Sequence, residues 1–142
     1  MATINLALNV QIVGGPKVLI SKSKSVEAYD KIEVVIEPVG ADGMAKTVEI
    51  QPGGENQVSF LLINSSLYGP ELTYVANDGD SITLDEPHLY LGTGAVSLLA
   101  SDGPKTIAFT NAHPVDSEQQ AAIEILVGRD ATPSDDSSGD ES

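Results

Sequence analysis

Apolar and polar residues alternate along most of this chain, and the alternation predicts short β-strands. From residue 4 to residue 12 every second residue is a large aliphatic one, and those between are small or polar. A period of two places the aliphatic side chains on one face of a strand and leaves the other face in water. A Gly-Gly-Pro sequence then ends this strand. Residues 18–20 are expected to form a second short strand or the return arm of a hairpin, and residues 21–25 a basic loop or a sheet edge.

The most apolar run of the chain covers residues 57–64 and predicts a central strand. Glycines precede the run, and Asn, Ser, Gly and Pro follow it. A short apolar run between turn signals is typical of a strand that is buried on both faces. Further strands are predicted at 47–50, 72–76, 81–84, 88–91 and 96–99. In three more, alternation gives one apolar face: Ile32, Val34 and Ile36 in 31–37, Ile107 and Phe109 in 105–110, and Ile123, Ile125 and Val127 in 121–127.

Two of these segments carry additional signals. Residues 72–84 contain an Asp-Gly pair between alternating segments, which predicts a β-hairpin because glycine supplies the positive φ of the turn. Residues 121–127 could continue a helical turn at 116–120 or form a last strand. The strand is favoured because β-branched residues dominate it.

The predicted strands indicate an all-β fold. About nine to eleven short strands, with turn signals every eight to twelve residues, are typical of an antiparallel β-sandwich or jelly roll. We expect one domain over residues 1–128, because this length is enough for a single core. Residues 129–142 contain no large apolar residue and five acids, so they are predicted to be a disordered acidic tail.

Composition narrows the classes of protein that fit. With two Phe, four Tyr and no Trp, the core must be mainly aliphatic. The chain has no cysteine, which excludes disulfides, thiolate zinc sites and cysteine nucleophiles. No run approaches the roughly 18 apolar residues of a membrane span, and the N-terminus does not resemble a signal peptide. We therefore expect no membrane association and a cytoplasmic or virion location.

The net charge of −14 is unevenly distributed. Residues 1–46 hold five acids and five lysines, whereas residues 47–142 hold sixteen acids against Lys105 and Arg129. Direct nucleic-acid binding is disfavoured, because it needs a basic face. A basic protein partner or a contact between copies is compatible with this distribution. Acidity that only maintains solubility explains it equally well.

His88 and His113 are the only histidines, and acids lie near each of them in sequence. Two histidines and a carboxylate could bind a metal. However, the spacing matches no metal-binding motif, so two unrelated surface histidines are the favoured interpretation.

Asp78, Asp80 and Asp85 are the candidate calcium ligands. A helix–loop–helix calcium loop needs oxygen ligands at its first, third and fifth positions. If Asp78 and Asp80 take the first and third positions, the fifth is Ile82, whose side chain has no oxygen. A looser site between loops, with Asp85 or Glu86 added, stays open as an interpretation. The hairpin turn explains the same residues without an ion.

We expect no enzymatic activity and no cofactor. The chain contains no nucleophile elbow, no phosphate-binding loop and no complete dinucleotide-binding motif, and six aromatic residues offer little for stacking sugars. Gly92-Thr93-Gly94 is interpreted as a bulge or a sharp bend.

The favoured function is that of a structural β-sandwich subunit, in a homo-oligomer or a larger shell, filament or virion-type particle. The opening strand could pair in its own sheet, which is the simpler arrangement, or with the edge of a neighbouring copy. One alternative is an acidic-tailed module that binds a basic protein. Its layout, a β-sandwich followed by an acidic tail, resembles that of the nucleoplasmin-type histone chaperones. A sandwich that binds glycans or calcium is the other alternative.

Overall fold

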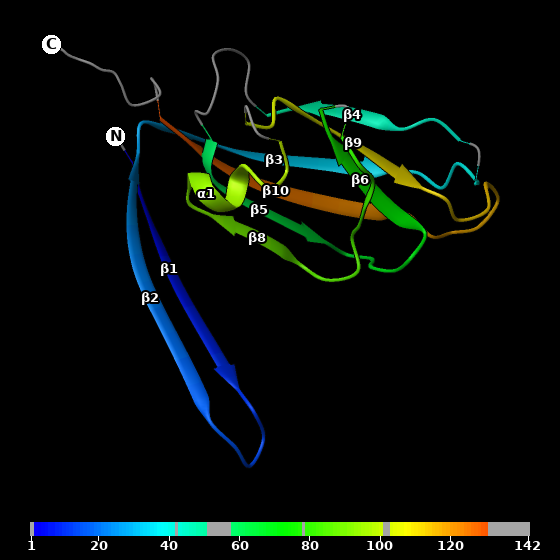
Figure 1. The fold of residues 1–142 in the computed structure, drawn as a ribbon. Coiled ribbons are helices and arrows are strands. Elements are labelled where there is room, and N and C mark those ends of the chain that lie inside the picture. The colour runs from blue at the N-terminus through cyan, green and yellow to red at the C-terminus, as the bar shows by residue number, and fades with distance from the viewer. Residues whose placement is uncertain (1, 42, 51–57, 78, 101–102, 131–142) are drawn as a thin grey trace, which may run out of the picture.

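The computed structural model describes residues 2–41, 43–50, 58–77, 79–100 and 103–130. These residues form ten strands and one four-residue helix, and the strands pair in three antiparallel sheets (Figure 1). The all-β antiparallel fold expected from the alternation is confirmed. The predicted tail from residue 131 onward lies outside the described residues.

Eight strands form a sandwich of two four-stranded sheets. One sheet has the order β3-β10-β5-β8 and the other β4-β9-β6-β7, so the chain passes back and forth between the layers. This order is that of a jelly roll, one of the two architectures predicted. The bounds of the sandwich strands are β3 Ala28–Ile36, β4 Lys46–Glu49, β5 Val58–Ser65, β6 Leu72–Ala76, β7 Ile82–Thr83, β8 His88–Leu91, β9 Thr106–Asn111 and β10 Ala121–Arg129.

The core lies between the two sheets, and alternate residues of several strands supply most of it. In β10, Ile123, Ile125 and Val127 are buried, whereas the residues between them face outward. In β9 the buried pair is Ile107 and Phe109, as the alternation predicted. An apolar sheet face is unfavourable in water. The apolar faces of the two sheets therefore pack on each other, and this packing forms the core.

The run at residues 57–64 forms the interior strand β5, which pairs with β10 and β8. Its residues from Val58 to Leu61 are all buried, so both faces of this half of the strand are covered. The other half alternates between buried and exposed positions. The prediction of burial on both faces therefore holds for only half of the strand.

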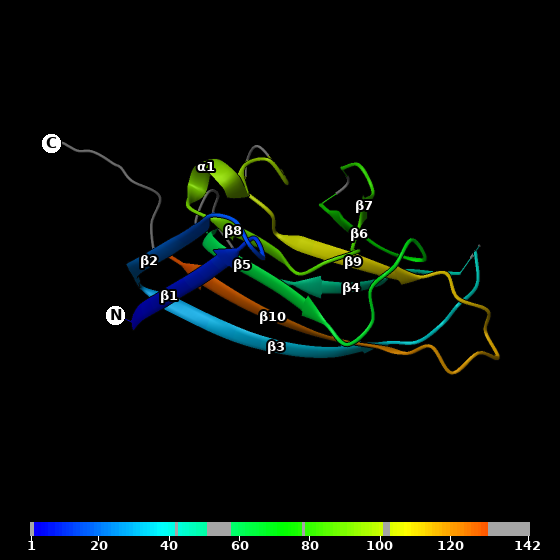
Figure 2. The same cartoon turned by 90° about the horizontal axis from the view of Figure 1, so that it is seen from below.

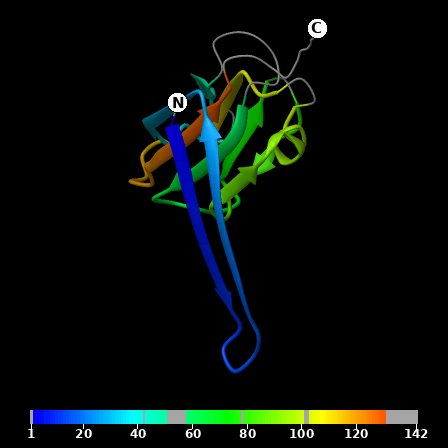
Figure 3. The ribbon, with the colours of Figure 1, turned by 90° about the vertical axis from the view of Figure 1, so that its left-hand side faces the viewer.

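The remaining strands, β1 (Ala2–Gln11) and β2 (Lys17–Val26), pair only with each other. They form a long hairpin that projects from one end of the sandwich (Figures 1 and 3). We call this hairpin, residues 2–26, the arm. The simpler expectation, that the opening strand belongs to a sheet of the main fold, is wrong. Of the two alternatives for residues 21–25, the sheet edge is correct and the loop is not, because β2 continues through them in a two-stranded sheet.

The predicted strand at residues 96–99 is also wrong. Gly92 follows β8 with φ of 89°, a conformation that glycine adopts without strain, and the chain turns into the short helix α1, Thr93–Val96. Val96 is buried beneath this turn. No helix in the described part of the chain is long and apolar enough to cross a membrane.

Candidate functional site

The arm is attached to the outer face of the β3-β10-β5-β8 sheet at a close contact. A Cβ atom added to Gly128 of β10 would lie 3.0 Å from Ile4 Cδ1, 3.0 Å from Val26 Cγ1 and 3.2 Å from the Cβ of Phe60. The missing side chain at Gly128 therefore lets the base of the arm approach the sheet closely. Val26, the last residue of the arm, is 1% exposed, so the joint is packed.

The two faces of the arm differ in chemistry. Residues directly opposite each other in an antiparallel pair share a face. One face carries the pairs Ile4–Lys24, Leu6–Lys22, Leu8–Ile20 and Val10–Val18. The other face carries mainly small and polar residues, and there the Ser23 hydroxyl donates a hydrogen bond of 2.8 Å to Asn5 Oδ1. We call the first of these the apolar face of the arm.

Only the base of the apolar face is covered. Ile4 and Leu6 are half-buried, whereas the outer part of the same face lies in solvent. Leu8 and Ile20 are each 40% exposed, Val10 is 49% exposed and Val18 is 55% exposed. Since successive pairs along one face are contiguous, these four side chains form a continuous apolar surface on a part of the arm that extends beyond the sandwich (Figures 1 and 3). Figure 2, seen from below, shows β1 and β2 in front of the sandwich.

Charge also separates the arm from the rest of the chain. Residues 1–26 contain Lys17, Lys22 and Lys24 and no acid, which gives a formal charge of +3. The remaining residues hold all 21 acids against four basic residues, a formal charge of −17. The arm is therefore a basic, amphipathic element on an acidic protein.

The polar group at His88 joins side chains of two different sheets. The Tyr74 hydroxyl of β6 lies 2.6 Å from His88 Nδ1 and 2.6 Å from the Tyr90 hydroxyl, both of which belong to β8. Because β6 and β8 belong to different sheets, this group links the two layers. Burial, and then the hydrogen bond to Tyr90, raise the pKa of Tyr74 far above its usual value. At neutral pH the hydroxyl is therefore protonated and acts as a fixed link between the sheets.

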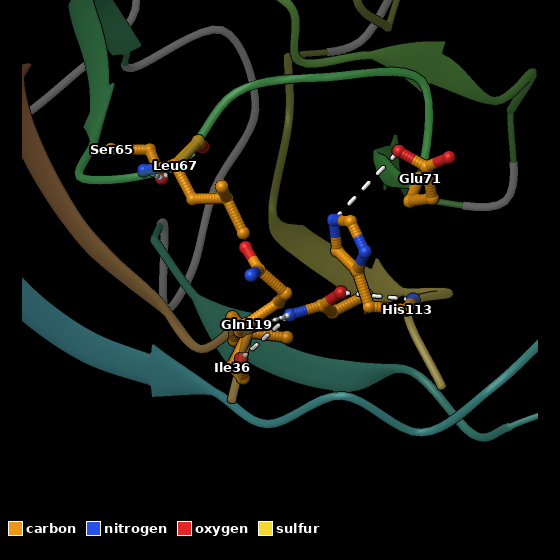
Figure 4. A network of polar contacts seen from close by, with 7 residues as sticks. Ile36, Ser65, Leu67, Glu71, His113 and Gln119 are labelled. Atoms are coloured by element: carbon orange, nitrogen blue, oxygen red, sulfur yellow. Dashed lines mark hydrogen bonds and ion pairs between the residues drawn. The ribbon is translucent and has the colours of Figure 1, made fainter. Parts of the chain in front are cut away.

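His113 belongs to a separate network at the end of β9 (Figure 4). The buried Asn111 amide donates to the carbonyls of Ile36 and Gln119, at 3.2 and 2.6 Å. Its Oδ1 accepts the backbone N–H of His113 at 3.2 Å. The His113 ring lies 3.7 Å from Glu71, as measured from Nε2 to Oε1. The network fixes the connection from β9 to β10.

The two histidines are thus bound to different partners. His88 Nε2 lies 3.6 Å from Asp85 Oδ1, whereas His113 is paired with Glu71. Among the described residues no group of three or more His, Asp or Glu side chains could hold a metal ion. Within the described residues, the structure therefore does not bring the two histidines together at one carboxylate.

The candidate calcium ligands are only partly placed. Asp80 is exposed, and Asp85 is 64% exposed on its side chain and paired with His88. Asp78 lies outside the described residues, so this site stays a prediction. The hairpin that contains them is confirmed: β6 and β7 pair with Tyr74 opposite Ile82.

The alternative that residues 18–20 are the return arm of a hairpin is confirmed, and the hairpin is longer than expected because β2 covers residues 17–26. The alternating run 4–12 and residues 17–26 lie on either side of Gly14 and Gly15 at matching distances. Gly14 adopts φ of 77° in the turn, where Ile12 and Pro16 are joined by a backbone hydrogen bond of 3.0 Å. Pairing the two segments across this turn would have identified the lysines at 22 and 24 as strand residues opposite Leu6 and Ile4.

No family model, no curated protein and no solved structure matches the chain.

Proposed function

We propose that the protein is a non-catalytic structural subunit that associates with further copies of itself through the arm. The observation that supports this is the exposed outer half of the apolar face, formed by Leu8, Val10, Val18 and Ile20. Contiguous apolar surfaces of this kind mark interaction sites on soluble proteins. His88 and His113 are each engaged in contacts within the fold, whereas the outer half of the apolar face has no such contact among the described residues.

The stability of a hairpin supports the same proposal. A two-stranded hairpin that stands alone is marginally stable in water, because one face has nothing to pack against. Only the base of this arm has such a contact, at Gly128. A partner that covers the outer half would stabilise the arm and remove the four apolar side chains from water. Burial of these part-exposed side chains would contribute on the order of 1 kcal/mol each.

The test is the mass of the protein in solution. We expect light scattering behind size-exclusion chromatography to give a multiple of 14.8 kDa that grows with concentration from about 1 to 100 μM. A mass of one chain throughout this range would overturn the proposal.

A matched pair of variants identifies the surface involved. The first replaces the exposed apolar face with threonine, which retains strand propensity but removes aliphatic surface: Leu8→Thr, Val10→Thr, Val18→Thr and Ile20→Thr. We expect self-association to weaken at least tenfold, since about 1.4 kcal/mol corresponds to that factor. The control places threonine on the opposite face of the arm, at Ala7, Asn9, Gln11 and Ser21, and should associate as the unmodified chain does.

A second candidate function follows from the charge of −17 outside the arm. An acidic module could bind a basic protein by charge complementarity, as the sandwich-and-tail layout suggested. Such a complex would dissociate as salt is raised, and it would weaken on truncation after Asp130. It would be insensitive to the four threonine substitutions on the apolar face. That pattern would favour this candidate over self-association.

A further inference from the structure

Two arrangements of copies could cover the outer half of the arm. In one, the apolar faces of two arms pack on each other across a twofold axis. In the other, the arm of one copy lies on the sandwich of the next. The charges distinguish them: two arms of +3 repel each other, whereas an arm of +3 is attracted to the remainder of another copy at −17. The second arrangement is therefore favoured.

The sandwich offers a receiving surface on the outer face of the β3-β10-β5-β8 sheet. A shallow hollow of about 600 Å³ lies across β3, β10 and the end of β5. Val35 and Ala122, both exposed, give it apolar surface, and Glu33 and Glu124 give it negative charge. Lys31 Nζ bonds both carboxylates, at 3.2 and 3.0 Å, so the three groups together carry one net negative charge. The exposed apolar part of the arm is bordered by Lys22 on the same face and by Lys17 on the opposite face, so its charge complements that of this hollow.

The arm of the same copy does not occupy this hollow. The base of the arm packs at Gly128, whereas the hollow includes Glu124, four residues earlier in β10. At about 3.3 Å per residue the two positions are about 13 Å apart along the strand. From its base the arm projects away from the sandwich (Figures 1 and 3). Within the described residues, each copy therefore presents an arm whose outer half is uncovered and, separately, an open hollow.

We propose that the outer half of the arm of one copy docks in the hollow of the next, with the apolar face against Val35 and Ala122. This inference rests on the proposed self-association and adds its geometry. Because arm and hollow are different surfaces, the contact is heterologous. Repetition of such a contact gives a ring if it closes and an open filament if it does not.

Disulfide crosslinking between copies tests the geometry, and the absence of cysteine in the chain gives a clean background. One chain carries Val10→Cys on the arm. A second chain, made distinguishable by a mass tag, carries Ala122→Cys in the hollow. We expect mild oxidation of the mixture to give the mixed dimer as the main product. Adding Leu8→Thr, Val18→Thr and Ile20→Thr to the Val10→Cys chain should abolish this product.

The control pairs the Val10→Cys chain with a Leu98→Cys chain, because Leu98 is 82% exposed but lies after α1, outside the hollow. We expect at least tenfold less mixed dimer from that pair. A product dominated by dimers of the Val10→Cys chain with itself would indicate packing of arm on arm and would overturn the inference. Equal crosslinking to positions 98 and 122 would overturn it as well.

The outcomes separate this inference from the proposed function. If light scattering shows assemblies but the Val10→Cys and Ala122→Cys chains do not crosslink, the docking geometry is wrong and self-association stands. If the protein is a monomer at all concentrations, both fail together.

Discussion

The arm and the sandwich are built from the same kind of strand, yet one is exposed and the other is buried. In β1, aliphatic residues alternate from Ile4 to Val10, and in β10 they alternate from Ile123 to Val127. The β10 residues are at most 1% exposed, whereas Val10 is 49% exposed. The two strands differ in what lies above the apolar face. A second sheet covers β10, and nothing in the described chain covers the outer half of β1.

This difference separates two properties of an alternating strand: whether it has an apolar face, and which surface covers that face. Alternation determines that a strand has an apolar face, because successive side chains point to opposite sides. It does not determine which surface covers that face, and the surface can belong to the same chain or to another one. An apolar face that is regular in sequence but uncovered in the folded chain is therefore a candidate interface, as we propose for the arm. Variants in the two regions test this proposal.

The largest expected effect is a difference in the stability lost when an isoleucine in each region is replaced by alanine. Ile63 is fully buried in β5 and Ile20 is 40% exposed in β2. We expect Ile63→Ala to lower the free energy of unfolding by about 2–5 kcal/mol, because it removes buried methyl groups and leaves a cavity. Ile20→Ala should lower it by less than about 1 kcal/mol. Urea unfolding at low micromolar concentration, where self-association is weakest, measures both. Similar losses from the two substitutions would mean that the outer half of the arm is covered within the monomer.

The joint between the regions is the next test. In Gly128→Ala the new methyl group would lie 3.0 Å from both Ile4 Cδ1 and Val26 Cγ1. We expect a loss of about 1–3 kcal/mol in the free energy of unfolding, which is typical of overpacking, together with chemical-shift changes in the base of the arm. The control is Gly94→Ala in α1, where an added Cβ meets nothing within 4 Å. Helix propensity predicts that the control is neutral or stabilising by up to about 1 kcal/mol. Equal behaviour of the two variants would show that the arm is not packed at Gly128.

Polar links also distinguish the regions, and Tyr74 provides the test. Tyr74→Phe removes the hydroxyl that lies between His88 and Tyr90, and we expect a loss of about 1–3 kcal/mol because buried polar groups lose a partner. The control Tyr29→Phe concerns a tyrosine that is 57% exposed and should change stability by less than about 0.5 kcal/mol. In the arm, loss of the exposed Ser23–Asn5 hydrogen bond in Ser23→Ala should be equally small.

The raised pKa of Tyr74 adds a pH dependence with a definite sign. In the unfolded chain the hydroxyl ionises near pH 10, whereas burial keeps it protonated in the fold to higher pH. The contribution to stability is therefore fully present below about pH 10 and is lost as pH rises above it. Unfolding midpoints between pH 8 and about 11 should fall less steeply in Tyr74→Phe than in the unmodified chain. Parallel falls would show that Tyr74 ionises freely in the folded protein.

Most of the sandwich could be predicted from the sequence, because it depends on local alternation. The strands that contain Ile32, Ile107 and Ile123 were expected with the correct buried faces, and the hairpin at Tyr74 was expected from its Asp-Gly turn. The helix α1 was missed because the apolar residues at 96–99 match a short strand as well as a helical turn, and the positive φ of Gly92 decides between them.

The candidate site could be predicted only in part, for reasons of topology. The alternation of residues 4–12 identified the apolar face, but its place outside both sheets depends on how eight later strands pair. Contacts between residues far apart in sequence, such as Gly128 with Ile4, leave no local pattern. Likewise, the pairing of His88 with Tyr74 and of His113 with Glu71 follows from strand order rather than from spacing.

The smallest expected effect on folding comes from Lys31→Gln, and this substitution separates folding from assembly. Lys31 bonds Glu33 and Glu124 on the exposed face of the sheet, which lowers the pKa of Glu124 and raises that of Lys31. Because exposed ion pairs are screened by water, we expect Lys31→Gln to lower the free energy of unfolding only slightly near pH 7. The pair contributes above the unfolded pKa of Glu124, near 4.3, and the contribution is lost as pH falls through the lower folded value.

The same substitution should strengthen association between copies if the arm docks in the hollow. Without Lys31 the hollow changes from one net negative charge to two, which increases its attraction for an arm of +3. Light scattering at low salt should then show assembly at a lower protein concentration, although the fold is slightly less stable. The gain in assembly should disappear at about 1 M salt, where the Debye length is about 3 Å. Stability and assembly that decrease together would instead mean that Lys31 supports the interface directly, and that the arm meets the sandwich of its neighbour on some other face.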